Sequence, residues 1–151
     1  MKLRWAALVL VLALGLLVPQ VLFAQATSDP PGREDSQAEL GQNYPNPFHT
    51  DTRIPFAVGD APRCTEPSKL YRVSLRIYNI LSQLVATPLL QGGGGAVAGG
   101  QPLESVMLPC DRYVAFWDGL GDGNREVASG VYIYRLEVDG KPYVKKMWLA
   151  R

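Results

Sequence analysis

Short segments in which apolar and polar residues alternate run from Leu40 to Arg151, and Gly, Pro, Asp and Asn separate them. Alternation with a period of two places the apolar side chains on one face of a β-strand. No stretch of this region keeps the 3.6-residue period of a helix. Strands are therefore expected over residues 54–58, 72–77, 84–90, 113–117, 131–138 and 142–151. This pattern constrains the region to an all-β domain.

The number and length of these strands narrow the fold class. Six to eight short strands in about 110 residues predict a small immunoglobulin-like antiparallel β-sandwich, in which alternate residues of two sheets fill the core. A small closed barrel is the alternative that the pattern leaves open. The expected core residues are Ile54, Phe56, Val58, Val73, Leu75, Ile77, Tyr113, Ala115, Trp117, Tyr132, Tyr134, Leu136 and Val138.

Turn-forming residues indicate how these strands connect. Residues 79–83 are expected to form a turn, after which 84–90 return as one antiparallel strand. The glycine-rich run 92–100 is expected to be a loop, because glycine loses much backbone entropy in regular structure. Asp139-Gly140 can supply the two positive-φ residues of a tight hairpin. Pro55 has no N–H for a ladder hydrogen bond, which predicts that its strand lies at a sheet edge.

The N-terminus has the three parts of a secretory signal peptide in the required order. Lys2 and Arg4 provide the positive start, residues 5–18 form an unbroken apolar run of 14, and Ala24 is a small residue that suits signal peptidase. The run is shorter than the roughly 20 residues that span a bilayer, so cleavage is favoured over an uncleaved anchor. We therefore expect residues 1–24 to engage the Sec translocon and signal peptidase.

Residues 25–39 are polar and rich in Pro, Ser and charged side chains, which predicts a disordered linker before a domain at 40–151. Removal of residues 1–24 takes away two of the 15 basic residues and none of the 14 acidic ones, so the exported chain is nearly neutral. A nucleic-acid-binding domain would show a basic stripe, and this chain has none. We therefore expect no nucleic-acid partner.

Two cysteines, Cys64 and Cys110, are candidates for a disulfide, because an exported chain enters an oxidising compartment. Each cysteine precedes a strand that is expected to run in the same direction, which places both at one end of the sandwich. Two separate thiols are the alternative, since the strand order across the sheets is not known from sequence.

Five segments resemble, in order, the type A C-terminal sorting domains of the type IX secretion system, a group related to the Ig-like domain of the flagellar hook-capping protein. The similarity extends over residues 40–151, with Ser82 where the family usually has glycine and with an insertion from Gly92 to Pro109. The matching segments are Leu40-Gly41-Gln42-Asn43-Tyr44-Pro45-Asn46-Pro47-Phe48, Ile77-Tyr78-Asn79-Ile80-Leu81, Trp117-Asp118-Gly119, Val127 to Leu136, and Lys145 to Arg151.

The resemblance implies a non-catalytic address label that the type IX secretion machinery reads. Such a protein would cross the periplasm in transit and then reach the cell surface or be secreted. The residues that the resemblance implies in sorting and recognition are Asn43, Tyr44, Pro45, Asn46, Pro47, Phe48, Gly130, Tyr132, Lys145 and Lys146.

The same residues also have a structural interpretation. Pro45 and Pro47 fix their own φ angles and push their predecessors into extended geometry, which predicts a stiff extended segment with Tyr44 and Phe48 as plugs for the sandwich edge. Lys145 and Lys146 should point to opposite faces of one strand. Structural pinning of the edge is therefore an alternative to recognition.

Other function classes find little support in the sequence. The turn 118–124 has oxygen-bearing residues, but Leu120 and Ser129 occupy positions where a calcium loop needs ligands, so no metal is expected. His49 is the one histidine and has no nucleophile motif beside it, so we expect no enzyme activity, no cofactor and no small-molecule substrate. The rival to a sorting role is a structural or adhesive Ig-like module of the periplasm or envelope that is not itself sorted. Only about 15 residues separate the signal peptide from the domain, so a large passenger is not expected, which favours this rival.

Overall fold

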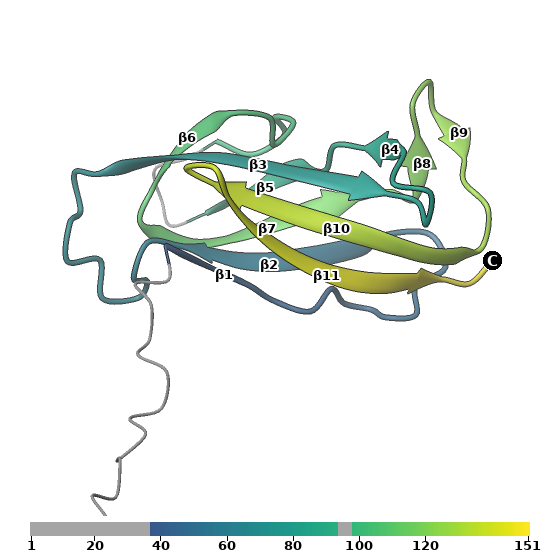
Figure 1. Cartoon of the computed structure of the whole chain (residues 1–151), viewed down its shortest axis with the longest axis horizontal. Helices are drawn as coiled ribbons and strands as arrows, with labels where there is room; N and C mark the ends of the chain where they lie inside the picture. Colours follow the sequence, from purple (N-terminus) through teal and green to yellow (C-terminus); the bar gives the residue numbers. More distant parts are fainter. Residues whose placement is uncertain (1–36, 94–97) are drawn as a thin grey trace, which may run out of the picture. The chain divides into compact units, whose positions relative to one another are not determined.

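Two antiparallel sheets take up the alternating segments of the sequence (Figure 1). The computed structural model describes residues 37–93 and 98–151; the predicted signal peptide and most of the predicted linker lie outside them. The first sheet has the strand order β1-β2-β7-β5, and the second has the order β11-β10-β3-β4 with β6 beside β3. The strands are β1 (Ala38–Leu40), β2 (Thr52–Val58), β3 (Leu70–Tyr78), β4 (Leu84–Ala86), β5 (Leu89–Gly93), β6 (Val106–Pro109), β7 (Asp111–Trp117), β8 (Leu120–Gly121), β9 (Arg125–Glu126), β10 (Gly130–Val138) and β11 (Lys141–Leu149).

These two open sheets make the domain an antiparallel β-sandwich, as the alternation predicts, and not a closed barrel. β8 and β9 form a separate small hairpin. Every residue expected in the core is buried, including the alternate residues of β3, β7 and β10. The part of the chain that the structure describes contains no helix long and apolar enough to cross a membrane.

Pro55 does not lie at a sheet edge, so this prediction is wrong. Its strand, β2, pairs with β1 on one side and β7 on the other. The carbonyl of Pro55 accepts a hydrogen bond from the amide of Gly41 at 2.8 Å, which places its backbone polar groups on the β1 side. In an antiparallel ladder the N–H and C=O of one residue point the same way, so the missing donor leaves the β2–β7 ladder intact. The proline sits where β1 has just ended.

The segment 84–90 is not one strand, as expected, but two. β4 pairs with β3 in one sheet, and β5, which follows Pro88, pairs with β7 in the other. β5 also continues to Gly93, which is partnered by Tyr113, so the first glycines of the glycine-rich run belong to a strand. A period-two pattern does not predict where the chain crosses from one sheet to the other, because both strands bury one face in the same core.

The two predicted turns of the second sheet are confirmed. Asp139 and Gly140 have φ angles of +48° and +85° and join β10 directly to β11. At the other turn, the Asn79 side-chain oxygen accepts hydrogen bonds from the amides of Leu81 (2.9 Å) and Gln83 (3.0 Å). Ser82 has a φ of +60°, a left-handed conformation that favours glycine.

The predicted disulfide is confirmed. Cys64 and Cys110 are bonded, with their Cα atoms 5.5 Å apart. Cys64 lies in the loop before β3, and Cys110 lies between β6 and β7. Because β3 and β7 run in the same direction as expected, the two residues meet at one end of the sandwich.

We predict that the double variant Cys64→Ala/Cys110→Ala loses about 4 kcal/mol of unfolding free energy, because the bridge constrains a loop with a sequence separation of 46 residues in the unfolded chain. Urea unfolding of the purified protein measures this change. The wild type in reductant should match the double variant. Two alkylatable thiols in the untreated wild type would contradict the prediction.

Candidate functional site

Two motif segments that lie about 100 residues apart in the sequence run side by side along the outer edge of β11. The amide of Phe48 donates to the carbonyl of Trp148 at 3.0 Å, and the amide of Ala150 donates to the carbonyl of Phe48 at 2.9 Å. The Asn46 side-chain oxygen accepts a hydrogen bond from the Trp148 amide at 2.9 Å. We call this seam, residues 42–48 together with residues 146–150, the composite edge.

The composite edge covers backbone groups of β11 that no neighbouring strand pairs with. β11 is the last strand of its sheet, so one row of its backbone groups has no neighbouring strand. The backbone groups of Trp148 face Asn46 and Phe48, and the Lys146 carbonyl accepts a hydrogen bond from the Gln42 side chain at 3.0 Å. Exposed edges of this kind invite pairing with other chains. Residues 42–48 cover this one.

Asn43 anchors the start of the composite edge inside the domain. Its side chain is buried and donates to the carbonyl of Pro45 and the hydroxyl of Thr52, both at 3.0 Å. Its amide donates to the Tyr134 hydroxyl at 3.1 Å, and that hydroxyl donates to the carbonyl of Gly41 at 2.9 Å. Asn43 therefore has every feature of a structural residue and offers little to a partner.

The proline-rich segment is bent and not extended, so that part of the structural interpretation is wrong. Tyr44 still pairs with Arg53 of β2, whereas Phe48 pairs in parallel with Leu149 of β11. The chain must cross from one sheet to the other between these two bridges, and the peptide bonds before Pro45 and Pro47 are both cis. The crossing requires the bend.

Phe48 is a plug, as predicted, and Tyr44 is not. The Phe48 side chain is 0% exposed and meets the Trp117 ring edge-to-face, with 5.4 Å between the ring centroids. Trp117 meets Tyr132 in the same manner at 5.4 Å. The Tyr44 side chain, by contrast, is 49% exposed.

The other residues predicted in recognition come from β10 and β11. Gly130 begins β10 opposite Leu149, and the buried Tyr132 donates its hydroxyl to the carbonyl of Ala128 at 2.7 Å. Lys145 lies opposite the inward-facing Tyr134 and is half-buried, whereas Lys146 is exposed. The two lysines therefore point to opposite faces, as expected.

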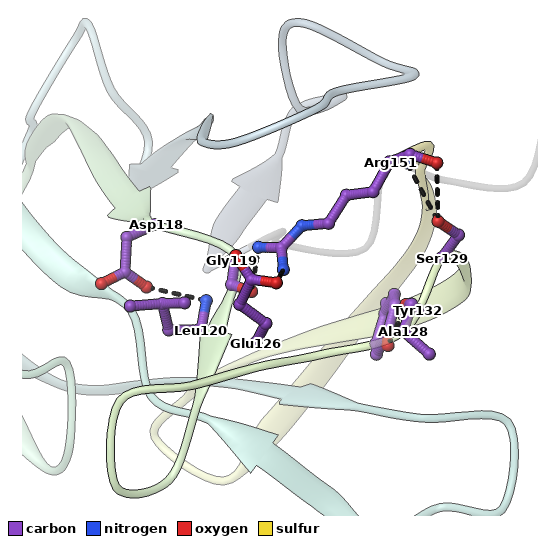
Figure 2. Close-up of polar contacts among 8 residues, drawn as sticks. All are labelled: Asp118, Gly119, Leu120, Glu126, Ala128, Ser129, Tyr132 and Arg151. Carbon is purple, nitrogen blue, oxygen red and sulfur yellow. Dashed lines mark hydrogen bonds and ion pairs between the residues drawn. The ribbon is translucent and has the colours of Figure 1, made fainter.

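Arg151 joins three of the motif segments (Figure 2). Its guanidinium donates to the carbonyl of Gly119 at 2.9 Å and lies 3.4 Å from the carboxylate of Glu126. Its amide donates to the hydroxyl of Ser129 at 2.9 Å. Gly119 has a φ of +71°, and a Cβ at this position would lie 2.5 Å from the carbonyl oxygen of Thr50. Only glycine fits there.

Gln42, Trp148 and Arg151 contribute to the site, although none of them is predicted individually from the sequence. Trp148 lies in a matching segment and is exposed, and the alternation of β11 already indicates that it faces away from the core. The roles of Gln42 and Arg151 depend on contacts with distant segments and have no local signal. The exposed residues of the composite edge are Gln42, Tyr44, Pro45, Asn46, Pro47, Lys146, Trp148 and Ala150.

The polar groups around the composite edge are used in structural contacts. His49 is exposed, as expected, and its Nδ1 contacts the carbonyl of Ala150. The Asp118 carboxylate accepts a hydrogen bond from the amide of Leu120 at 3.0 Å (Figure 2). Within residues 37–93 and 98–151, no three His, Cys, Asp or Glu side chains come together as metal ligands would.

Comparisons with known proteins give one match. No family model and no curated protein matches the chain. Among solved structures, the chain is similar to the crystal structure of dimeric latent PorU from Porphyromonas gingivalis, with 18% sequence identity and a TM-score of 0.47. The similar region covers 75% of this chain and 9% of that one.

We predict that Phe48→Ala and Tyr44→Ala differ sharply in stability although both residues belong to one motif. Phe48→Ala should cost about 3–5 kcal/mol of unfolding free energy, because it empties a buried site against Trp117. Tyr44→Ala should change it by about 0.5 kcal/mol or less. Urea unfolding monitored by tryptophan fluorescence distinguishes them. Equal losses would show that the motif does not divide into a buried and an exposed part.

We also predict loss of stability at alkaline pH. Burial raises the pKa of the Tyr132 and Tyr134 phenols, and burial together with the Asp111 carboxylate raises the pKa of Tyr113 to about 12. In the unfolded chain these phenols titrate near pH 10, at about their ordinary pKa. The unfolded chain therefore loses protons first, so stability is unchanged by these groups below about pH 10 and falls as the pH rises towards about 12.

Urea midpoints measured through this pH range, together with tyrosinate absorbance, test this prediction. Tyr113→Phe serves as the comparison and should show a shallower decline, because it removes one shifted phenol. A wild-type midpoint that stays constant through the range would contradict it.

Proposed function

We propose that residues 40–151 are a non-catalytic sorting domain, which directs export across the outer membrane and delivery to the cell surface by the type IX secretion machinery. The observation that carries this proposal is the convergence of the matching segments. Asn46 and Phe48 are bonded to the strand end at residues 148–150, and Arg151 ties Gly119 and Ser129 to the same end of the domain. Segments scattered over the whole domain thus contribute to one continuous surface.

The remaining segment lies beside this surface. Tyr78 is paired with Ile133 of β10, and Ile133 is paired with Lys146 of β11. A receptor that contacts the composite edge can therefore reach all five segments without any change of conformation. This arrangement suits recognition of a folded domain and does not require an unfolded peptide signal.

The motif residues divide into two roles in this proposal. Asn43, Phe48, Gly119 and Tyr132 build the surface from inside, because they are buried or closely packed. The exposed Tyr44 to Pro47, Lys146 and Trp148 are the side chains that a receptor would contact. The Cys64–Cys110 disulfide supports export to an oxidising compartment.

A structural or adhesive module of the periplasm or envelope is the second candidate function. One observation favours it: most motif residues make contacts that the fold itself needs, such as the Asn43 and Phe48 contacts. In that case the matching segments would be needed for the sandwich fold and would have no role in recognition.

We predict that the full chain, with a fluorescent reporter inserted after Gln25, delivers the reporter to the surface of a host with a working type IX apparatus. Protease treatment of intact cells should then remove the fluorescence. In the double variant Tyr44→Ser/Lys146→Ser the reporter should remain inside the cell, because two side chains that a receptor would contact are lost. Both side chains are exposed, so the fold should be unchanged.

The matched control is Arg112→Ser, an exposed residue of β7 in the other sheet, which should be sorted normally. Both variants should keep the disulfide and the wild-type urea midpoint. A wild-type reporter that remains periplasmic would exclude the sorting role and favour the structural module.

A further inference from the structure

The solvent-facing side of the second sheet carries apolar side chains at the end next to the composite edge. The register places Leu84, Tyr78, Ile133 and Lys146 directly opposite one another across β4, β3, β10 and β11. Two pairs further along, Val131 lies opposite Trp148. Tyr78, Val131, Ile133, Lys146 and Trp148 each have a buried neighbour along their strand and so point outward, and Leu84 is 49% exposed. We call Tyr78, Ile80, Leu81, Leu84, Val131, Ile133 and Trp148 the apolar strip.

The turn after β3 holds the most exposed part of the apolar strip. Ile80 and Leu81 are each 72% exposed. Their turn is held by Asn79, whose side chain accepts from the amides of Leu81 and Gln83 and donates to the Gln83 side chain at 2.8 Å. Two large aliphatic side chains held outward on a fixed turn contribute no burial to this fold. An exposed apolar patch of this kind marks an interaction site.

The charges of this face indicate what covers the apolar strip. Lys146 lies beside Ile133 and Trp148 of the strip, and across the described residues no ion pair joins Lys146 to a carboxylate. Two acidic side chains of this sheet's surroundings are already paired with arginines: Glu137 with Arg135 at 3.1 Å, and Glu104 with Arg76 at 3.5 Å. The complementary surface is therefore apolar and carries an acidic group opposite Lys146.

We propose that the apolar strip is the docking surface for an apolar, carboxylate-bearing protein surface of the secretion machinery, an inference that rests on the proposed function. The strip is continuous with the composite edge, because Trp148 belongs to both and is bonded to Asn46. It crosses four paired strands, a width of about 14 Å. Its broad face includes Tyr78 and Trp148, and these two residue types are enriched in the cores of protein interfaces.

The test places Ile80→Ser/Leu81→Ser in the full chain with the reporter after Gln25. The matched control is Leu70→Ser/Met107→Ser, which changes two side chains that are 52% and 49% exposed on the same face at the opposite end of the sheet. We expect the surface-exposed reporter to fall by about tenfold or more in the strip variant, as for loss of a binding hot spot. The control should match the wild type.

A second pair of variants tests the charge. Lys146→Glu should reduce the surface-exposed reporter by about tenfold, because a glutamate would be repelled by the acidic group of the partner. Lys146→Arg keeps the positive charge and should match the wild type. Disulfide content and urea midpoint confirm that each variant folds.

A flotation experiment tests lipid as the occupant of the strip. Purified full chain is mixed with vesicles of phosphatidylethanolamine and phosphatidylglycerol and centrifuged on a density gradient.

Each outcome decides the proposal. Loss of sorting in the strip variant, with a sorted control and no flotation of the wild type, supports a protein partner. A strip variant that is sorted like the wild type overturns the inference and leaves the proposed function standing. Flotation of the wild type but not of the strip variant identifies lipid as the occupant and overturns the protein partner. A wild-type reporter that is not sorted overturns the proposed function and this inference with it.

Discussion

The edge at which the chain crosses between the two sheets depends on two hydrogen bonds of the Tyr134 hydroxyl. Tyr134 lies fully buried in β10, and its hydroxyl donates to the carbonyl of Gly41 and accepts from the amide of Asn43. It thereby satisfies backbone groups at the point where the chain leaves β1. Gly41 must be small here, because a Cβ would lie 2.7 Å from the Pro55 ring. Pro55 has no N–H that could donate to the carbonyl of Gly41 across the sheet. The hydroxyl of Tyr134 donates to that carbonyl instead.

From this point the chain can cross to the other sheet and close the edge of β11. The closure uses side chains as well as backbone, since Asn46 and Gln42 bond to β11 where no regular strand lies. Such a covering protects an edge strand without extending the sheet. It also brings together the two segments that are most distant in the sequence. The surface that we propose as a sorting signal therefore exists only in the folded domain that contains both segments.

The matching segments cannot be interpreted as a list of contact residues. Asn43, Phe48 and Gly119 are needed because of burial, ring packing and backbone conformation, and a change at any of them alters the fold before it alters recognition. The exposed members, together with the apolar strip, are the ones whose chemistry is free for a partner. This division explains how one set of residues can support both a structural and a recognition role.

Local patterns in the sequence were sufficient to predict β2, β3, β7, β10 and β11, the expected core residues, the Asp139-Gly140 hairpin and the end of the sandwich at which Cys64 and Cys110 meet. Each of these follows from local periodicity, turn chemistry or strand direction. Tertiary structure alone decided that β2 is an inner strand despite Pro55, that 84–90 is shared between two sheets, and that Phe48 is buried whereas Tyr44 is exposed. The reason is physical: a period-two pattern specifies which face of a strand is apolar. The neighbour along each strand edge is chosen by hydrogen bonds between segments far apart in the chain.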